Sequence, residues 1–352
     1  MKTSLRLAST PQRRSRPRIN DRSKGSYSGQ HPRRRFLTLA AGVAALPAVS
    51  RISSAQTYPT RPITMIVPFP AGGGADINGR VVAERMSSSL GRPIVIENIS
   101  GADGSIGTGR AARARPDGYT LIVGQTSTFV LNGAVYSLQY DLLNDFAPVS
   151  PLAASPVFLF ARKTLPANGL SELIVWLKAN PASGAIQVVS SRLLMAFFQK
   201  EIGTQFTLVP YRGNAPAMQD LMAGHIDLAF AGGDSLPLMQ AGNIKAYAVA
   251  SDTRVANAPD IPTFAEIGLP TLSYSEWFGL FAPKGTPKDI ISRLNAAAVE
   301  ALADPAVRLR IVEVGYDIFP RVQQTPEALT ALVKGDTEKW SPLIKEFGIK
   351  AE

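Results

Sequence analysis

The chain has 352 residues, no cysteine and a formal net charge of +10. Without cysteine it has no disulfide, no thiolate nucleophile and no site for lipid attachment of the lipoprotein type. The first 55 positions hold 12 of the 37 Lys and Arg residues but only one of the 27 acidic residues, which leaves 25 basic and 26 acidic side chains elsewhere. This distribution excludes nucleic acid as a partner, because a groove for nucleic acid needs clustered cations.

The first 55 residues have the parts of an export signal. An Arg-rich, acid-poor stretch ends in Arg33-Arg34 with Phe36-Leu37 just behind, and a mild apolar run over 39–49 and small residues over 53–55 follow. The pattern fits a twin-arginine signal that is cleaved near Ala55 and sends the chain to the periplasm. The alternative is a basic disordered tail before a short buried helix. No later segment has the roughly 18 uninterrupted apolar residues that a transmembrane helix needs.

Strand and helix patterns alternate after the leader. Apolar β-branched runs predict strands over 63–67, 94–97 and 120–123, and apolar residues at helical spacing predict helices over 77–90 and 106–114. This alternation indicates right-handed βαβ units, with a parallel sheet covered by helices on both faces.

The same alternation continues in the second part of the chain. Further strands are predicted over 157–161, 186–189, 207–210, 226–230 and 245–250. Helices are predicted over 170–179, 193–202, 215–223 and 236–240. After a Pro-rich connector, an apolar segment over 277–281 precedes two long helices over 287–303 and 326–347.

This order predicts an α/β protein with two lobes, each a mostly parallel sheet flanked by helices. Residues 1–55 are the signal, residues 56–154 plus 256–352 form lobe 1, and residues 155–255 form lobe 2. The chain crosses between the lobes twice, which makes a two-segment hinge. A cleft between lobes is a common place for a small-molecule site.

The sequence PFPAGGGAD over residues 68–76 lies between a predicted strand and a predicted helix. It lacks the Lys-Ser or Lys-Thr of a phosphate-binding P-loop, and its glycine spacing does not fit a dinucleotide site. Glycines let backbone N–H groups converge, and the positive end of the next helix dipole begins at Ala75-Asp76, so an anion site is indicated. The alternative is a tight strand-to-helix turn with Asp76 as the N-cap.

Two more polar loops follow strands. Residues 101–107 repeat the strand, glycine and helix theme, and residues 125–128 place amide and hydroxyl groups at the carboxyl end of a strand. Ligands of open α/β sheets bind at that edge, although simple loop capping is the alternative.

Features of an enzyme are absent from the sequence. His225 is the one histidine after the leader, and its place between a helix end and a strand indicates a partner of the helix dipole. Neither G-x-S-x-G nor H-E-x-x-H occurs, and the His and Cys inventory allows no metal-ligand spacing. No catalytic residue, metal or cofactor is predicted.

Seven motifs in order give the chain a family resemblance. They are residues 61–76 (RPITMIVPFPAGGGAD), 91–98 (GRPIVIEN), 116–121 (PDGYTL), 145–149 (DFAPV), 209–213 (VPYRG), 224–228 (GHIDL) and 277–280 (WFGL). With these motifs the chain resembles the extracytoplasmic solute receptors of tripartite tricarboxylate transporters, the Bug family. The resemblance covers essentially the whole chain after the leader, and it implies a periplasmic-binding-protein-like fold that closes on a small carboxylated solute.

The resemblance also implies the binding residues. In the family, backbone amides of the first strand-to-helix loop hold one carboxylate, and hydroxyl-bearing loops of both lobes hold the other end of the solute. The matching positions in the first lobe are Phe69, Ala71, Gly72, Gly73, Asp76, Thr126, Ser127 and Thr128. Those in the second lobe are Tyr211, Gly213, Gly232, Gly233 and Asp234.

One loop departs from the family pattern. After the strand predicted over 186–189, the family has a longer loop of the type S-x-G-x-G-[ST] that contributes hydroxyl groups. Here Ser190, Ser191 and Arg192 stand in a shorter connection. Ser190 and Ser191 are expected to supply part of the missing contact, and Arg192 to bring a cation toward the cleft.

The expected function is therefore that of a monomeric receptor which delivers a small organic acid to the large and small membrane permease subunits of such a transporter. The alternative is a ligand-sensing partner of a membrane signalling protein, which would use the same cleft and a different docking surface. A hydrolase or lyase would need a nucleophile and base that the sequence does not supply.

Overall fold

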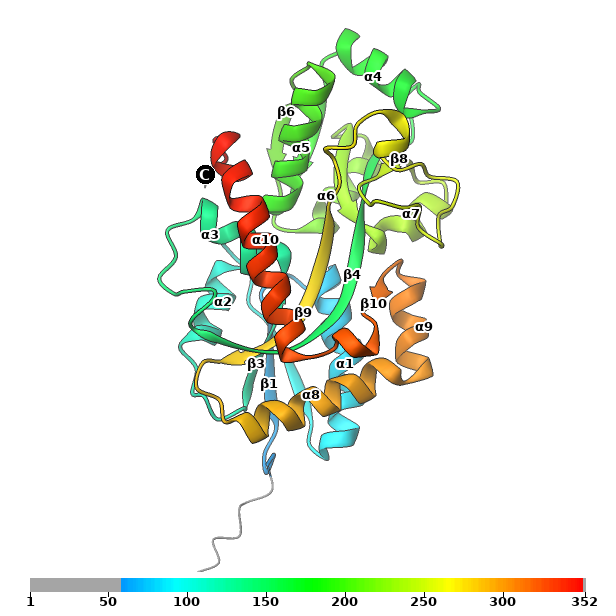
Figure 1. Cartoon of the computed structure of the whole chain (residues 1–352). Coiled ribbons are helices and arrows are strands. Elements are labelled where there is room, and N and C mark those ends of the chain that lie inside the picture. The colour runs from blue at the N-terminus through cyan, green and yellow to red at the C-terminus, as the bar shows by residue number, and fades with distance from the viewer. Residues whose placement is uncertain (1–57, 351–352) are drawn as a thin grey trace, which may run out of the picture. The chain divides into compact units, whose positions relative to one another are not determined.

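The computed structural model describes residues 58–350, and the predicted export signal lies outside these residues (Figure 1). Ten strands form one continuous hydrogen-bonded sheet, in which the main path has the order β2-β1-β3-β9-β4-β7-β5-β6. It has two parts, sheet A and sheet B, which share the long strand β4 (Phe146–Arg162). We call the part of the protein built on sheet A lobe 1 and the part built on sheet B lobe 2.

Sheet A begins with three parallel strands, β1 (Ile63–Val67), β2 (Ile94–Asn98) and β3 (Thr120–Gln125). Strand β9 (Ser275–Pro283) then runs antiparallel between β3 and β4. The helices α1 (Gly74–Leu90), α8 (Lys288–Ala303) and α9 (Pro305–Glu313) enclose one apolar cluster of lobe 1. Helix α2 (Ser105–Ala112), the π-helical turn η1 (Ser127–Leu131) and α3 (Asn132–Val135) complete the N-terminal half.

Sheet B contains β5 (Ser183–Ile186), β6 (Thr207–Pro210), β7 (Leu228–Gly232) and β8 (Ile244–Val249). Strand β5 pairs in parallel with β6 and β7, whereas β4 pairs antiparallel with β7 and β8. Its helices are α4 (Leu170–Ala179), α5 (Val189–Ile202), α6 (Asn214–Ala223) and α7 (Leu236–Gln240), with the 3-10 turns η2 (Gly233–Ser235) and η3 (Ala265–Ile267). The pairing is thus mixed in both sheets.

The C-terminal segment contains β10 (Asp317–Ile318), η4 (Arg321–Gln323) and α10 (Pro326–Glu346). Helix α10 packs on β4, η1 and α3, and it ends beside α5 of lobe 2 (Figure 1). There the rings of Phe197 and Phe347 lie 4.2 Å apart between centroids. One apolar cluster continues from Phe129 and Phe281 in lobe 1 to Phe198 and Phe230 in lobe 2, so the lobes share a core.

Several predicted elements have the observed bounds, among them 63–67, 170–179, 207–210 and 236–240. The strand predicted over 186–189 is wrong, because β5 ends at Ile186 and α5 begins at Val189. The cause is Ser191, whose hydroxyl oxygen accepts hydrogen bonds from the N–H groups of Gln187 (2.9 Å) and Val188 (3.2 Å) and so fixes the helix start. Residues 190–192 are therefore helical and do not form the short loop that the sequence predicted.

Helix α9 was not predicted. Its N-cap is Asp304, whose carboxylate accepts hydrogen bonds from the N–H groups of Ala306 and Val307, and Pro305 occupies the first helical position. Both are recognised helix-start signals. The described residues belong to one compact unit, and the lobe boundaries near 155 and 255 stay predictions.

Candidate functional site

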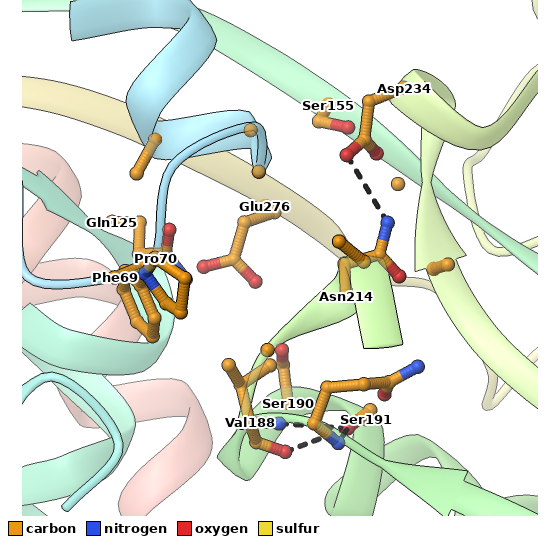
Figure 2. Close-up of a pocket in the computed structure, with 18 of the residues that line it drawn as sticks. Phe69, Pro70, Gln125, Ser155, Val188, Ser190, Ser191, Asn214, Asp234 and Glu276 are labelled. Carbon is orange, nitrogen blue, oxygen red and sulfur yellow. Dashed lines mark hydrogen bonds between the residues drawn. The ribbon is translucent and has the colours of Figure 1, made fainter. Parts of the chain in front are cut away.

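A cavity of about 110 Å³ lies between the two lobes (Figure 2). The lobe 1 side includes Phe69, Pro70, Gln125, Glu276, Phe278 and Tyr316. The lobe 2 side includes Gln187, Ser190, Ser191, Asn214 and Asp234, and Ser155 lies on β4, the strand that the two sheets share. A second cavity of about 490 Å³ shares Phe69, Gln187 and Gly213 with the first, so the two cavities adjoin each other.

The loop after β1 brings backbone N–H groups to the cavity wall. Gly73, Gly74 and Ala75 line the cavity, and α1 begins at Gly74. The N–H groups in the first turn of a helix have no partner within the helix. Gly74 is needed because an added Cβ would lie 2.5 Å from the hydroxyl oxygen of Tyr316 and 2.9 Å from Cζ of Phe278. This loop can hold an anion at the positive end of α1.

Asp76 supports this loop from outside the cavity. Its Oδ2 accepts hydrogen bonds from the N–H of Gly72 and from Nε of Arg80, each at 2.9 Å, and its Oδ1 accepts from Nδ2 of Asn98 at 2.8 Å. Burial works to raise the pKa of Asp76, but these hydrogen bonds and the positive charge of Arg80 lower it below its usual value. The charge of Asp76 is therefore neutralised away from the cavity.

Two helices of lobe 2 also begin at the cavity. Val188, Ser190 and Ser191 line it at the start of α5, and Gly213 and Asn214 line it at the start of α6 (Figure 2). Together with α1, three helix N-termini therefore face the cleft. Their dipoles favour negative charge there.

The protein itself places a carboxylate at the start of α5. Asp103, in the loop before α2 of lobe 1, accepts a hydrogen bond from the N–H of Val189. The pKa of Asp103 is raised to about 7, chiefly by burial and also by the Glu276 carboxylate, although the Val189 bond and the charge of Arg192 act to lower it. Asp103 has a positive φ of 53°, and its backbone carbonyl accepts a hydrogen bond from Nδ2 of Asn132 at 2.8 Å. This contact joins the two lobes beside the cavity.

Two buried amides in the site have unused hydrogen-bonding groups. Gln187 is 7% exposed, and neither Oε1 nor Nε2 of its side chain has a partner in the described structure. Oδ1 of Asn214 is also unpaired, whereas Nδ2 of Asn214 donates to Asp234 at 3.2 Å. Buried polar groups in proteins are nearly always hydrogen-bonded, so these groups in the cavity wall are available to bond water or a ligand.

The predicted hydroxyl loop after β3 has a structural role. Thr126, Ser127 and Thr128 are fully buried and do not line the cavity. The Thr126 hydroxyl accepts from the N–H of Trp277 at 3.0 Å, and the Thr128 hydroxyl bonds to the backbone of Gln125 at 3.1 Å. These residues fix η1 and β9, and the cavity is lined by Gln125 just before them.

Gly233 and Tyr211 also lie apart from the first cavity. An added Cβ on Gly233 would lie 2.6 Å from the carbonyl oxygen of Gly315, so at this point backbone packs on backbone between the lobes. The Tyr211 hydroxyl donates to Asp220 at 2.7 Å, and Tyr211 lines the second cavity.

The structure therefore brings part of the predicted set together. The predicted residues that line the first cavity are Phe69, Ala71, Gly73, Ser190, Ser191, Gly213, Gly232 and Asp234. Those that do not line it are Gly72, Asp76, Thr126, Ser127, Thr128, Tyr211 and Gly233. Arg192, which was expected to bring a cation toward the cleft, lines the second cavity, and its Nη1 donates to the carbonyl of Lys350 at 2.8 Å.

The sequence reasoning missed several cavity residues, among them Gln187, Asn214, Glu276 and Tyr316. Gln187 follows the apolar residue Ile186, and Asn214 follows Gly213. Neither belongs to a sequence motif that would have identified it. Glu276 gave a usable signal, since it is the one charged residue in the apolar run over 275–283. Tyr316 lies after α9, which was not predicted.

The described residues contain no helix long and apolar enough to cross a membrane. Among the same residues, no group of three or more His, Cys, Asp or Glu side chains is placed to hold a metal ion.

Comparison with known proteins identifies the family. The model of the tripartite tricarboxylate transporter family receptor matches residues 79–349. Protein BugT of Bordetella pertussis is 36% identical over 307 residues, which cover 84% of this chain and 92% of BugT.

Solved structures agree with the observed fold. The structure of the periplasmic binding protein BugD has a TM-score of 0.80 and 36% identity, and the match covers 83% of this chain and 100% of BugD. MatC from Rhodopseudomonas palustris with bound malate has a TM-score of 0.78 and 35% identity, covering 82% of this chain and 100% of MatC. The two-lobed α/β fold predicted from the sequence is confirmed. The chain belongs to the tripartite tricarboxylate transporter receptor family, which is the Bug family of periplasmic solute-binding proteins.

Proposed function

We propose that this protein captures a small carboxylated solute in the cavity between its lobes and delivers it to the large and small membrane subunits of a tripartite tricarboxylate transporter. The main support is the loop over residues 68–75, where the start of α1 presents unpaired N–H groups to the cavity. MatC, a relative with 35% identity, has malate bound.

The energetics suit reversible capture. A hydrogen bond from a backbone N–H to a carboxylate contributes about 1.5–3 kcal/mol, because one partner is charged. Two or three such bonds, together with the Gln187 amide, account for much of a micromolar dissociation constant, which corresponds to about −8 kcal/mol. A receptor needs this range, since it must release the solute to its membrane partners.

Isothermal titration against mono-, di- and tricarboxylates and amino acids tests the binding. We expect at least one of these acids to bind with a micromolar dissociation constant. Gln187→Ala should weaken that binding about tenfold, because it removes two polar groups from the cavity wall. Gln219→Ala is the matched control, since Gln219 is exposed on α6 and does not line the cavity. Folded protein that gives no heat with any acid would contradict the proposal.

Export and delivery need separate measurements. We propose that the twin-arginine signal directs the chain to the periplasm with cleavage near Ala55, and that the mature receptor is a monomer. Replacing Arg33 and Arg34 by lysine should retain the protein in the cytoplasmic fraction. Solute uptake into cells should require both this protein and the two permease subunits, and uptake that persists without the permease would contradict this partner.

A further inference from the structure

Glu276 is a buried carboxylate that points into the cavity (Figure 2). Its Oε1 accepts a hydrogen bond from the N–H of Ser127 at 2.9 Å, and its Oε2 accepts one from the Tyr274 hydroxyl at 2.8 Å. The Ser190 hydroxyl of lobe 2 makes a further hydrogen bond to it. These three hydrogen bonds stabilise the Glu276 carboxylate, but none of the three donor groups carries a positive charge.

Asp234 is a second carboxylate on the opposite wall (Figure 2). It accepts hydrogen bonds from Nδ2 of Asn214 at 3.2 Å and from the Tyr316 hydroxyl. Burial raises the pKa of Asp234 and of Glu276, because removal from water disfavours the charged form. The partners of Asp234 are again neutral.

The cavity lacks a buried cation to balance these two acids. Among the described residues that line the first cavity, Arg212 is the only one with a positive charge, and its side chain is exposed. Arg192 lines the second cavity, where its charge acts on Asp103. Ionising both acids without a cation is costly, so the pKa of each is raised, and a second carboxylate on the ligand would add to the repulsion. The unpaired amide of Gln187 independently marks the same cavity as a ligand site.

We propose that the solute carries a cationic nitrogen as well as a carboxylate, as amino acids do, and that Glu276 and Asp234 receive the nitrogen. The inference rests on the proposed function, because the start of α1 holds the carboxylate. A ligand ammonium group gives each acid the positive partner that the protein does not provide. The start of α1 then matches the negative charge of a zwitterion, and the two acids match its positive charge.

Matched pairs of acids test the inference on the unmodified protein. The pairs are succinate with aspartate, glutarate with glutamate, propanoate with alanine, and butyrate with γ-aminobutyrate. Each pair has the same carbon chain and differs in the amino group. We expect the amino member of the best-bound pair to bind at least about tenfold more tightly, since a charge-assisted hydrogen bond supplies that difference.

Glu276→Gln tests the residue. The amide keeps the shape of the side chain and an oxygen for the Ser127 N–H, but it removes the negative charge. The preference for the amino member should fall about tenfold or more in this variant, and Asp234→Asn should lower it in the same direction. Glu266→Gln is the control, because Glu266 is a carboxylate that accepts a hydrogen bond from the N–H of Thr263 at 2.7 Å and does not line the cavity.

The outcomes separate this inference from the proposed function. If no acid of either kind binds the folded protein, the proposed function fails. If the plain acids bind as well as or better than their amino partners, the function stands and the inference is overturned. If the amino members bind better but folded Glu276→Gln and Asp234→Asn keep the full preference, the assignment of these two residues is overturned.

Discussion

The helices α1 and α5 begin on opposite walls of the same cleft, yet their first-turn N–H groups have different surroundings. At α1 the nearby carboxylate, Asp76, is bonded to Arg80 and Asn98 outside the cavity, so the first-turn N–H groups stay open to a ligand. At α5 the N–H of Val189 already donates to Asp103 of the other lobe. One helix start is thus open to the cavity, whereas the other is occupied by a carboxylate of the opposite lobe.

The contrast shows that a helix N-terminus in a cleft is not sufficient to define a binding site. Both starts have the same dipole and the same unpaired N–H groups. What differs is where the protein's own carboxylate lies: behind the loop at α1, and directly on the helix end at α5. Four substitutions test this difference, beginning with the largest expected effect.

Asp76→Ala should disrupt the α1 start. It removes a buried carboxylate that accepts three hydrogen bonds and leaves Gly72 N–H and Asn98 without that partner. We expect the free energy of unfolding to fall by about 2–4 kcal/mol, measured by urea denaturation, together with loss of acid binding. Asp76→Asn keeps an acceptor and should lose less. A loss below about 1 kcal/mol in the alanine variant would show that the loop is held by other contacts.

Gly74→Ala should block the α1 start while leaving its charges intact. The new methyl group would meet the Tyr316 hydroxyl and the Phe278 ring, so the loop must shift at the cavity wall. We expect a loss of about 1–3 kcal/mol in stability and at least tenfold weaker acid binding by titration. Gly335→Ala on α10 is the control, because a Cβ there meets nothing within 4 Å. Unchanged affinity in Gly74→Ala would exclude this loop as the carboxylate site.

Asp103 gives the α5 contact a dependence on pH. Its pKa in the folded protein is about 7 and its ordinary value is 3.8, so the folded state binds the proton more tightly. The resulting stabilisation is fully present below about pH 4 and is lost as pH rises through about 7. Val189 N–H, Arg192 and Glu276 are the groups that act on this carboxyl.

Asp103→Asn should remove this dependence. Asparagine is neutral and tolerates the positive φ of this position. Relative to the natural protein, the variant should gain about 1–2 kcal/mol of stability between pH 4.5 and pH 8, measured by urea unfolding at each pH. Parallel stability curves for the two proteins across this range would contradict the assigned pKa.

Ser191→Ala should have the smallest effect. It removes the hydroxyl that accepts from the N–H groups of Gln187 and Val188, and such helix-start bonds contribute about 0.5–2 kcal/mol. We expect a modest fall in the thermal midpoint and little change in the affinity for acids. A large loss of affinity would place the Ser191 hydroxyl on the ligand instead.

The sequence predicted those parts of the site that depend on local pattern. The glycine run over 72–74 predicts that an anion can come close to the backbone N–H groups. In the structure the N-terminus of α1 lies at the cavity there. Strand β1 and helix α4 have their predicted bounds, because apolar periodicity and flanking turn residues agree in both segments.

Contacts between distant parts of the chain were beyond this reasoning. Asp103 and Val189 are 86 positions apart, and no local pattern shows that the carboxylate of one meets the N–H of the other. Thr126 and Ser127 follow a strand as ligand residues do, yet their partners are Trp277 and Glu276 on β9. Their burial depends on the antiparallel insertion of β9 beside β3, which the predicted parallel sheet did not include.

At Gly233 and Gly315 the main chains of the two lobes approach each other closely, with no room for a side chain between them. A single methyl group at residue 233 would act as a wedge, because the opposing carbonyl oxygen is 2.6 Å away and belongs to backbone that cannot rotate aside. Side chains of increasing size at this position would therefore increase the distance between the two lobes step by step. Such a series would measure how the separation of the two lobes affects the affinity for acids.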